Sequence, residues 1–271
     1  MSMRLSVVRG ALIVLVLGLV SVACQAPPSG AYTAPRTPDG KADLNGIWQA
    51  FGTAHWDLQS HSARQGPVTA LGAAFSIPAG LGVVEGDEIP YQPWAAEKKK
   101  ENQANWLKED PEIKCYLPGV PRSTYMPYPF QITQTPTHIL MAFEFATAVR
   151  SISMEKVGEA PVDSWMGQSA GRWDGDTLVV ETTGFNGKPW FDRAGNFASE
   201  NMKVVERFTR TGPDHVSYEA TIEDPKVFTR PWKISMPLYR RVEKNAQLLE
   251  YKCVEFAEEL LYGDLRKPTA K

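Results

Sequence analysis

The chain has 271 residues, 43% of them apolar, and its 29 basic and 31 acidic side chains give a formal net charge of −2. Nucleic-acid binding depends on a basic surface, so this composition argues against a nucleic-acid partner. The chain has three cysteines without a CxxC or HxxxH spacing, which argues equally against a structural zinc site.

The first residues are typical of an export signal. Two arginines precede an uncharged apolar run at residues 11–20, which is too short to span a membrane comfortably. Small residues at positions 21–23 suit a signal peptidase, and Cys24 follows directly. We therefore predict that Cys24 becomes the lipidated N-terminus of a lipoprotein, with simple cleavage as the alternative.

The domain organisation follows from this signal. We predict a signal peptide at residues 1–23, a flexible Pro-rich tether at 24–38 and a single β-rich domain at 39–271. The predicted location is the periplasm, where a lipid anchor in the outer membrane is the only membrane contact. A soluble periplasmic or secreted protein is the alternative.

The clearest helix signal covers residues 93–108. Pro93 suits a first helical turn, and the residues after it are strong helix formers. We expect Trp94 and Trp106, with Ala95 and Leu107, to dock this N-terminal helix on the core. The preceding residues 51–86 are rich in Gly, Ala and Pro, which predicts loops with short helical pieces.

Short segments of alternating apolar residues recur from Phe130 onward and predict β-strands. They lie within residues 139–145, 178–182, 202–208, 216–222, 232–238 and 249–253. Residues 171–185 predict a hairpin, because Asp174 and Gly175 suit a type I′ turn. Consecutive strands of this kind pair as an antiparallel meander, so we expect a mainly β fold, a lipocalin-like closed barrel or a half-open sheet. A β-sandwich is the alternative.

Cys115 and Cys253 remain once Cys24 is assigned to the signal. Two cysteines in an oxidising compartment are expected to form a disulfide bond. Such a bond would constrain the unfolded chain over a long loop. Two separate buried thiols are the alternative.

Several segments together resemble an uncharacterised family of exported bacterial proteins. The segments are EIPYQPWAAEKKKENQANW, CYLPGVPRSTYMPYPFQI, WMGQSAGRWDGDTLVVETTGF, WFDRAGNF, VVERFT and YEATIEDPKVFTRPWKISMPLYRR. They cover most of the chain from about Trp56 to the last predicted strand. The resemblance implies a single β-rich domain, and it implies no particular reaction.

The chain departs from this family pattern at four positions around the hairpin, namely Gln168, Ala170, Ala198 and Lys203. The family has Asp or His at the first position, Arg or a similar residue at the second, and commonly His at the last two. These departures predict that a polar cluster near the hairpin is lost or replaced in this chain.

Glu206 is the leading candidate for acid–base chemistry. It alternates with apolar residues of the same predicted strand, so its carboxylate should point toward the core. A buried carboxylate is costly unless it is paired, and the alternative is a structural ion pair with Arg150, Arg172 or Arg207. Glu181 lies on the opposite face of the hairpin and is a weaker candidate.

Four further residues could take part in proton transfer. Asp57 and His61 are four residues apart, which on a helix would let the carboxylate orient the imidazole. The alternative is a surface pair without function. Asp192 and Tyr125 are expected in loops at the rim of the barrel, although a packed aromatic is the simpler interpretation of Tyr125.

Two classes of function fit these residues. The first is a cofactor-independent acid–base enzyme, a lyase, dehydratase or isomerase, acting on a small hydrophobic or aromatic molecule. The second is a non-catalytic lipoprotein that binds a hydrophobic ligand. The chain contains no GxGxxG or Walker motif, so we expect no nucleotide cofactor. We also expect no serine nucleophile and no metal.

Overall fold

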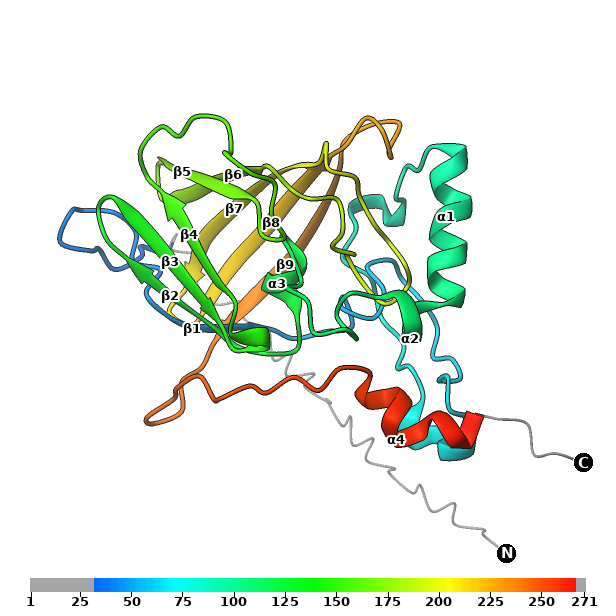
Figure 1. Ribbon diagram of the computed structural model, residues 1–271. Helices are drawn as coiled ribbons and strands as arrows, with labels where there is room; N and C mark the ends of the chain where they lie inside the picture. The colour runs from blue at the N-terminus through cyan, green and yellow to red at the C-terminus, as the bar shows by residue number, and fades with distance from the viewer. Residues whose placement is uncertain (1–31, 267–271) are drawn as a thin grey trace, which may run out of the picture. The chain divides into compact units, whose positions relative to one another are not determined.

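Strands close into a nine-stranded β-barrel within residues 32–266, the part of the chain that the computed structural model describes (Figure 1). The strands are β1 (Gly46–Ala50), β2 (Phe130–Gln134), β3 (His138–Phe143), β4 (Val149–Ser153), β5 (Gln168–Asp174), β6 (Thr177–Thr183), β7 (Lys203–Gly212), β8 (His215–Glu223) and β9 (Trp232–Arg240). The predicted signal peptide and the lipidation site Cys24 lie outside the described residues. The expected mainly β barrel is confirmed, and the sandwich alternative is not observed.

The strands follow one another around the barrel in sequence order. Antiparallel pairing of β1 with β9, in which Trp48 lies opposite Arg240, closes the ring. The neighbours pair antiparallel except β4 and β5, which run parallel where Ile152 lies opposite Ser169. A parallel pair needs a crossover connection, here residues 154–167, which we call the crossover. The start of the crossover lies over the outer face of the barrel and forms one wall of a hollow.

The helices lie in the connection between β1 and β2 and after the last strand, β9. They are α1 (Pro93–Ala104), α2 (Trp106–Glu109), α3 (Arg122–Tyr125) and α4 (Ala257–Arg266), with short 3-10 turns at Thr69–Phe75, Glu85–Asp87 and Phe145–Thr147. The predicted helix at 93–108 divides at Asn105, whose backbone is non-helical and whose side chain donates to the carbonyl of Glu101.

Three of the four residues expected to dock this helical region, Ala95, Trp106 and Leu107, are buried. Trp94 is half exposed, whereas Ala95 is fully buried and Asn102 donates to the carbonyl of Gly195. A β-carbon at Gly195 would lie 2.6 Å from the backbone nitrogen of Gln103, so glycine is what allows this close approach. Of the two tryptophans only Trp106, in α2, is buried as predicted.

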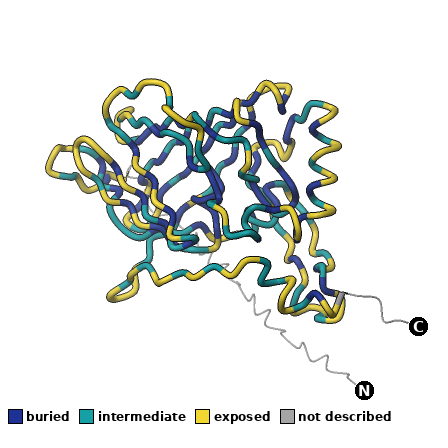
Figure 2. The backbone as a smooth tube through the Cα atoms, in the orientation of Figure 1, coloured by how far each residue is buried: buried dark blue, intermediate teal, exposed yellow. Residues whose placement is uncertain are grey.

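The barrel interior is filled with side chains. Trp48, Phe130, Phe208 and Tyr218 expose none of their surface, and the strands alternate buried residues with more exposed ones (Figure 2). A fully covered interior of this kind is a packed core. The aromatic-rich composition therefore supplies the core of the barrel. No helix within residues 32–266 has the length and apolar character needed to cross a membrane.

The residues that precede β1 contact the hairpin of β5 and β6. Ala34 is buried, and Arg36 donates to both carboxylate oxygens of Asp176, at 2.5 and 2.9 Å. These residues belong to the C-terminal part of the predicted tether at 24–38, and the remainder of that tether lies outside the described residues.

A disulfide bond joins Cys115 to Cys253, as predicted, with 5.8 Å between the two Cα atoms. It ties residues 241–266, the C-terminal segment, to the connection between α2 and α3. The segment is also held by a ring contact of Tyr251 with Phe145, at 5.0 Å between ring centroids. The disulfide is thus one of several links between this segment and the barrel.

Replacing Cys115 and Cys253 together with serine should lower the free energy of unfolding by about 2–4 kcal/mol. The bond closes a loop across a sequence separation of 138 residues, and its loss frees the unfolded chain. Urea unfolding of the double variant and the native protein measures the difference. Alkylation of the denatured, unreduced protein should leave both cysteines unlabelled, and labelling at either would contradict the bond.

Candidate functional site

The buried polar side chains inside the barrel form one hydrogen-bonded network around Glu206. One carboxylate oxygen of Glu206 accepts from Arg150 at 2.5 Å, and the other accepts from the hydroxyl of Tyr218 at 2.8 Å. Arg150 also donates to Ser169 and Thr182, at 2.9 and 2.7 Å. Burial and the neighbouring carboxylate of Glu206 raise the pKa of the Tyr218 hydroxyl well above its usual value.

This geometry corresponds to the ion pair that the sequence offered as the alternative to catalysis. Glu206 points inward as predicted, is completely buried and has both oxygens occupied by protein donors. Of the three arginines weighed as partners, Arg150 makes the pair, while Arg207 lies on the outer face and contacts Asp174 at 3.0 Å. A catalytic role for Glu206 stays a prediction, and the contacts give the carboxylate a structural role.

Asp192 and Asp57 form a second buried acidic site. Asp192 is completely buried and accepts from the backbone of Leu58 at 2.8 Å and from the side chain of Asn196 at 2.6 Å. Burial, then the nearby carboxylate of Asp57, raises the pKa of Asp192 to about 7. Asp57 itself is paired with Arg64 at 3.3 Å.

The hydroxyl of Tyr125 interacts electrostatically with Asp192 of this acidic site and with Glu206 of the barrel network. It is buried in α3, and its hydroxyl donates to the carbonyl of Phe191 at 3.0 Å. Burial, then the charge of Asp192, raises the pKa of Tyr125 well above its usual value, and Glu206 adds a smaller effect in the same direction. Asp192 lies in a loop, as expected, whereas Tyr125 lies in the short helix α3. Both side chains are buried, which agrees with the packed aromatic considered for Tyr125.

His61 lies apart from Asp57. Residues 57–61 are not helical, so the expected helical pair does not form. His61 makes a bridge with Gly80, and its Nδ1 lies 3.2 Å from the carbonyl oxygen of Ser62. The segment is extended because its backbone pairs with residues 77–80, as at Arg64 and Ile77. A shared acid–base role for Asp57 and His61 therefore has no local geometry to support it.

A cluster of buried ion pairs beside this acidic site was not foreseen. Arg122 is bidentate to Asp110 at 2.8 and 2.9 Å, and Arg193 is bidentate to Glu112 at 2.8 Å. Although burial raises the pKa of Glu112, its ion pair with Arg193 outweighs this and lowers the pKa to about 2. Burial, then the charge of Arg193, lowers the pKa of His55 to about 4.

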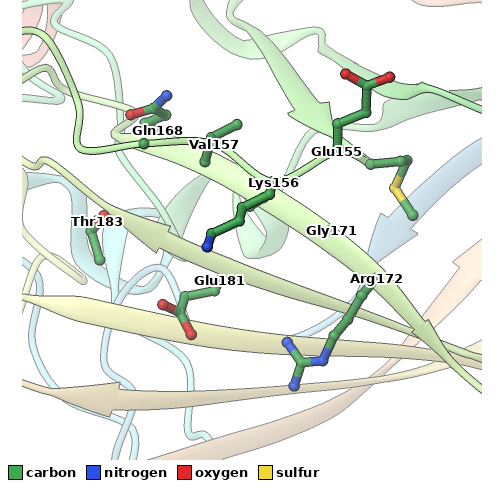
Figure 3. Close-up of a pocket in the computed structure, with 11 residues that line it drawn as sticks. Glu155, Lys156, Val157, Gln168, Gly171, Arg172, Glu181 and Thr183 are labelled. Carbon is green, nitrogen blue, oxygen red and sulfur yellow. The ribbon is translucent and has the colours of Figure 1, made fainter.

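A hollow of about 400 Å³ lies on the outer face of the hairpin. One side is the outward face of β5 and β6, and the other is the start of the crossover (Figure 3). The lining residues are Met154, Glu155, Lys156, Val157, Gly158, Gln168, Ala170, Gly171, Arg172, Glu181 and Thr183. We call it the outer hollow.

Two of the four departures from the family pattern line this outer hollow, and a third is next to it. Gln168 and Ala170 lie on its floor, and Ala170 is paired across the strands with Glu181. Lys203 forms an ion pair with Glu181 at 2.9 Å. The fourth, Ala198, is buried elsewhere. Three of the four predicted departures therefore lie on or beside the outer face of the hairpin.

The cations of the outer hollow have no protein partner among the described residues. Lys156 and Arg172 flank Glu181, whereas Glu155 points away (Figure 3). From Arg36 to Arg241, only the guanidinium of Arg172 lacks an ion pair, a hydrogen bond or a ring contact with another described residue. Lys156 comes from the crossover and carried no signal in the sequence.

Within residues 32–266, no group of three or more His, Cys, Asp or Glu side chains is arranged to hold a metal ion. No protein-family model and no curated protein matches the chain, so the resemblance to an exported family stays a prediction. The fold is a closed β-barrel, an architecture compatible with small-molecule binding.

Proposed function

We propose that the protein is an exported, non-catalytic β-barrel that binds a small molecule in the outer hollow. The observation that carries this proposal is a contrast between two regions. The charged and hydroxyl groups of the network around Glu206 are occupied by protein partners, whereas Lys156 and Arg172 in the hollow are not. Ligand sites characteristically combine a concave surface with a few polar groups that lack partners in the protein.

Export and lipidation at Cys24 belong to the same proposal. The Cys115–Cys253 disulfide supports a location outside the cytoplasm, because such bonds persist in oxidising compartments. A lipid at Cys24 would be followed by the chain up to residue 31 before the described domain begins. Globomycin treatment of producing cells, followed by mass analysis of the N-terminal peptide, tests lipidation at Cys24.

A fragment-binding experiment tests the ligand site. Fragments that bind should perturb the backbone NMR signals of residues 168–172 and 181–183. Ala170→Trp should weaken that binding at least about tenfold, because its indole would fill the floor of a hollow of about 400 Å³. Ser217→Trp, on the outer face of β8, is the matched control and should bind as the native protein does. Fragments that perturb only other regions would contradict the proposal.

Acid–base catalysis is the second candidate, and one observation favours it. Burial together with Asp57 brings the pKa of Asp192 to about 7, where a carboxyl group exchanges protons readily at neutral pH. Lyase, dehydratase or isomerase chemistry on a small aromatic substrate would suit such a group with Tyr125 beside it. A turnover screen of aromatic metabolites tests this candidate, and any activity should be lost in Asp192→Asn.

A further inference from the structure

We infer that the ligand of the outer hollow is a small organic carboxylate, whose head group is held by Arg172 and Lys156. This inference rests on the proposed function, because it names the ligand class for the same site. The carboxylate is inferred from the hydrogen-bond donors, the charges and the apolar lining of the hollow.

Arg172 supplies the donor geometry that a carboxylate needs. A guanidinium presents its N–H groups in a planar fork, which matches the two oxygens of a carboxylate. The other arginines from Arg36 to Arg241 already use their side chains on protein groups, as Arg122 does with Asp110. Arg172 is exposed and lines the hollow, so its fork is open to a bound molecule.

The balance of charge around the hollow favours an anion. Lys156, Arg172 and Lys203 are three cations, and Glu155 and Glu181 are two anions, which leaves a net charge of +1. Glu181 is already paired with Lys203 at 2.9 Å, so its charge is offset before a ligand binds. Lys156 then adds a second cation, whose side chain reaches toward Glu181 from the crossover (Figure 3).

The remaining lining suits an apolar body attached to the carboxylate. Met154, Val157 and Ala170 supply apolar surface beside the charged groups. A β-carbon at Gly171 would lie 2.7 Å from the sulfur of Met154, so a larger residue there would force the Met154 side chain to shift. Gln168 and Thr183 add neutral hydrogen-bonding groups to the lining.

Three matched probes separate this inference from the proposed function. Benzoate, benzyl alcohol and benzylamine share a ring and differ in the charge of the head group. We expect benzoate to perturb the NMR signals of β5 and β6 with at least about tenfold higher affinity than the other two. Its affinity should fall as sodium chloride rises, because exposed charges are screened by salt.

Two substitutions of opposite charge, at Arg172 and Glu181, then test which side chains interact with the carboxylate. Arg172→Gln should weaken benzoate binding about tenfold, and Glu181→Gln should strengthen it several-fold, because it removes a negative charge and frees Lys203. Arg207→Gln, an exposed arginine on the neighbouring strand β7, is the control and should leave the affinity unchanged.

Each outcome has a distinct meaning. Tighter binding of benzyl alcohol or benzylamine at β5 and β6 would overturn the carboxylate and leave the site in place. Effects of Arg172→Gln and Glu181→Gln in the same direction would also overturn it. The absence of binding by all three probes at this face would contradict both the ligand class and, with the wider fragment experiment also negative, the site itself.

Discussion

Replacing Arg150 with Met should lower the free energy of unfolding by about 3–5 kcal/mol. The substitution removes the cation that contacts Glu206 and leaves a carboxylate buried inside the barrel without its charge partner. The hydroxyls of Ser169 and Thr182 also lose the donor they share. Urea unfolding followed by tryptophan fluorescence measures the loss.

The double variant Arg150→Met with Glu206→Gln is the control for this prediction. A neutral amide carries no charge to desolvate, and its oxygen can still accept from Tyr218. The double variant should therefore recover a large part of the stability lost in the single variant. A loss below about 1 kcal/mol for Arg150→Met alone would show that the buried pair does not stabilise the barrel in the way the contacts indicate.

Asp192 should make the protein less stable as the pH rises from about 4 to above 7. Its pKa is about 7 in the folded chain, against 3.8 for an unperturbed carboxyl group. A raised folded pKa means that the folded state binds the proton more tightly than the unfolded state. The stabilisation is therefore complete below the unfolded pKa and lost as the pH passes the folded pKa. The difference is roughly 3 pKa units, so the effect is on the order of 4 kcal/mol.

Asp192→Asn should abolish this part of the pH dependence, because the asparagine side chain does not titrate. Asp57→Asn should move the loss of stability to lower pH, because it removes a charge that raises the pKa of Asp192. Unfolding free energies at several pH values between 4 and 8 compare the variants with the native protein. Parallel curves for Asp192→Asn and the native protein would mean that Asp192 titrates normally.

Three strands that carry the interior network, β6, β7 and β8, were predicted because their side chains alternate, whereas β4, which carries Arg150, was not. On β7, Glu206 lies between Val204 and Phe208 on the inward face, and the period of two fixes its direction. Its partner could not be chosen from the sequence, because alternation says nothing of which strands are neighbours across the interior. The parallel pairing of β4 with β5, which brings Arg150 beside Ser169, has no signature in either strand.

The acidic site was harder to predict, because loops carry no periodic pattern. Asp192 and Tyr125 were identified as residues of interest, but their burial depends on distant groups such as the backbone of Leu58. The outer hollow could be predicted from the sequence only in part. The departures at Gln168 and Ala170 pointed to its floor, whereas Lys156 is placed there only by the path of the crossover.

The crossover gives the barrel a region that can change without cost to the rest of the fold. Lengthening a surface connection costs little loop entropy, and residues 154–167 carry one wall of the hollow outside the strand ladder. Insertions or deletions there would alter the size and charge of the hollow while β5 and β6 keep their pairing. Proteins with this barrel that prefer different ligands would then differ mainly in the crossover. The length of the crossover is the property to compare between them.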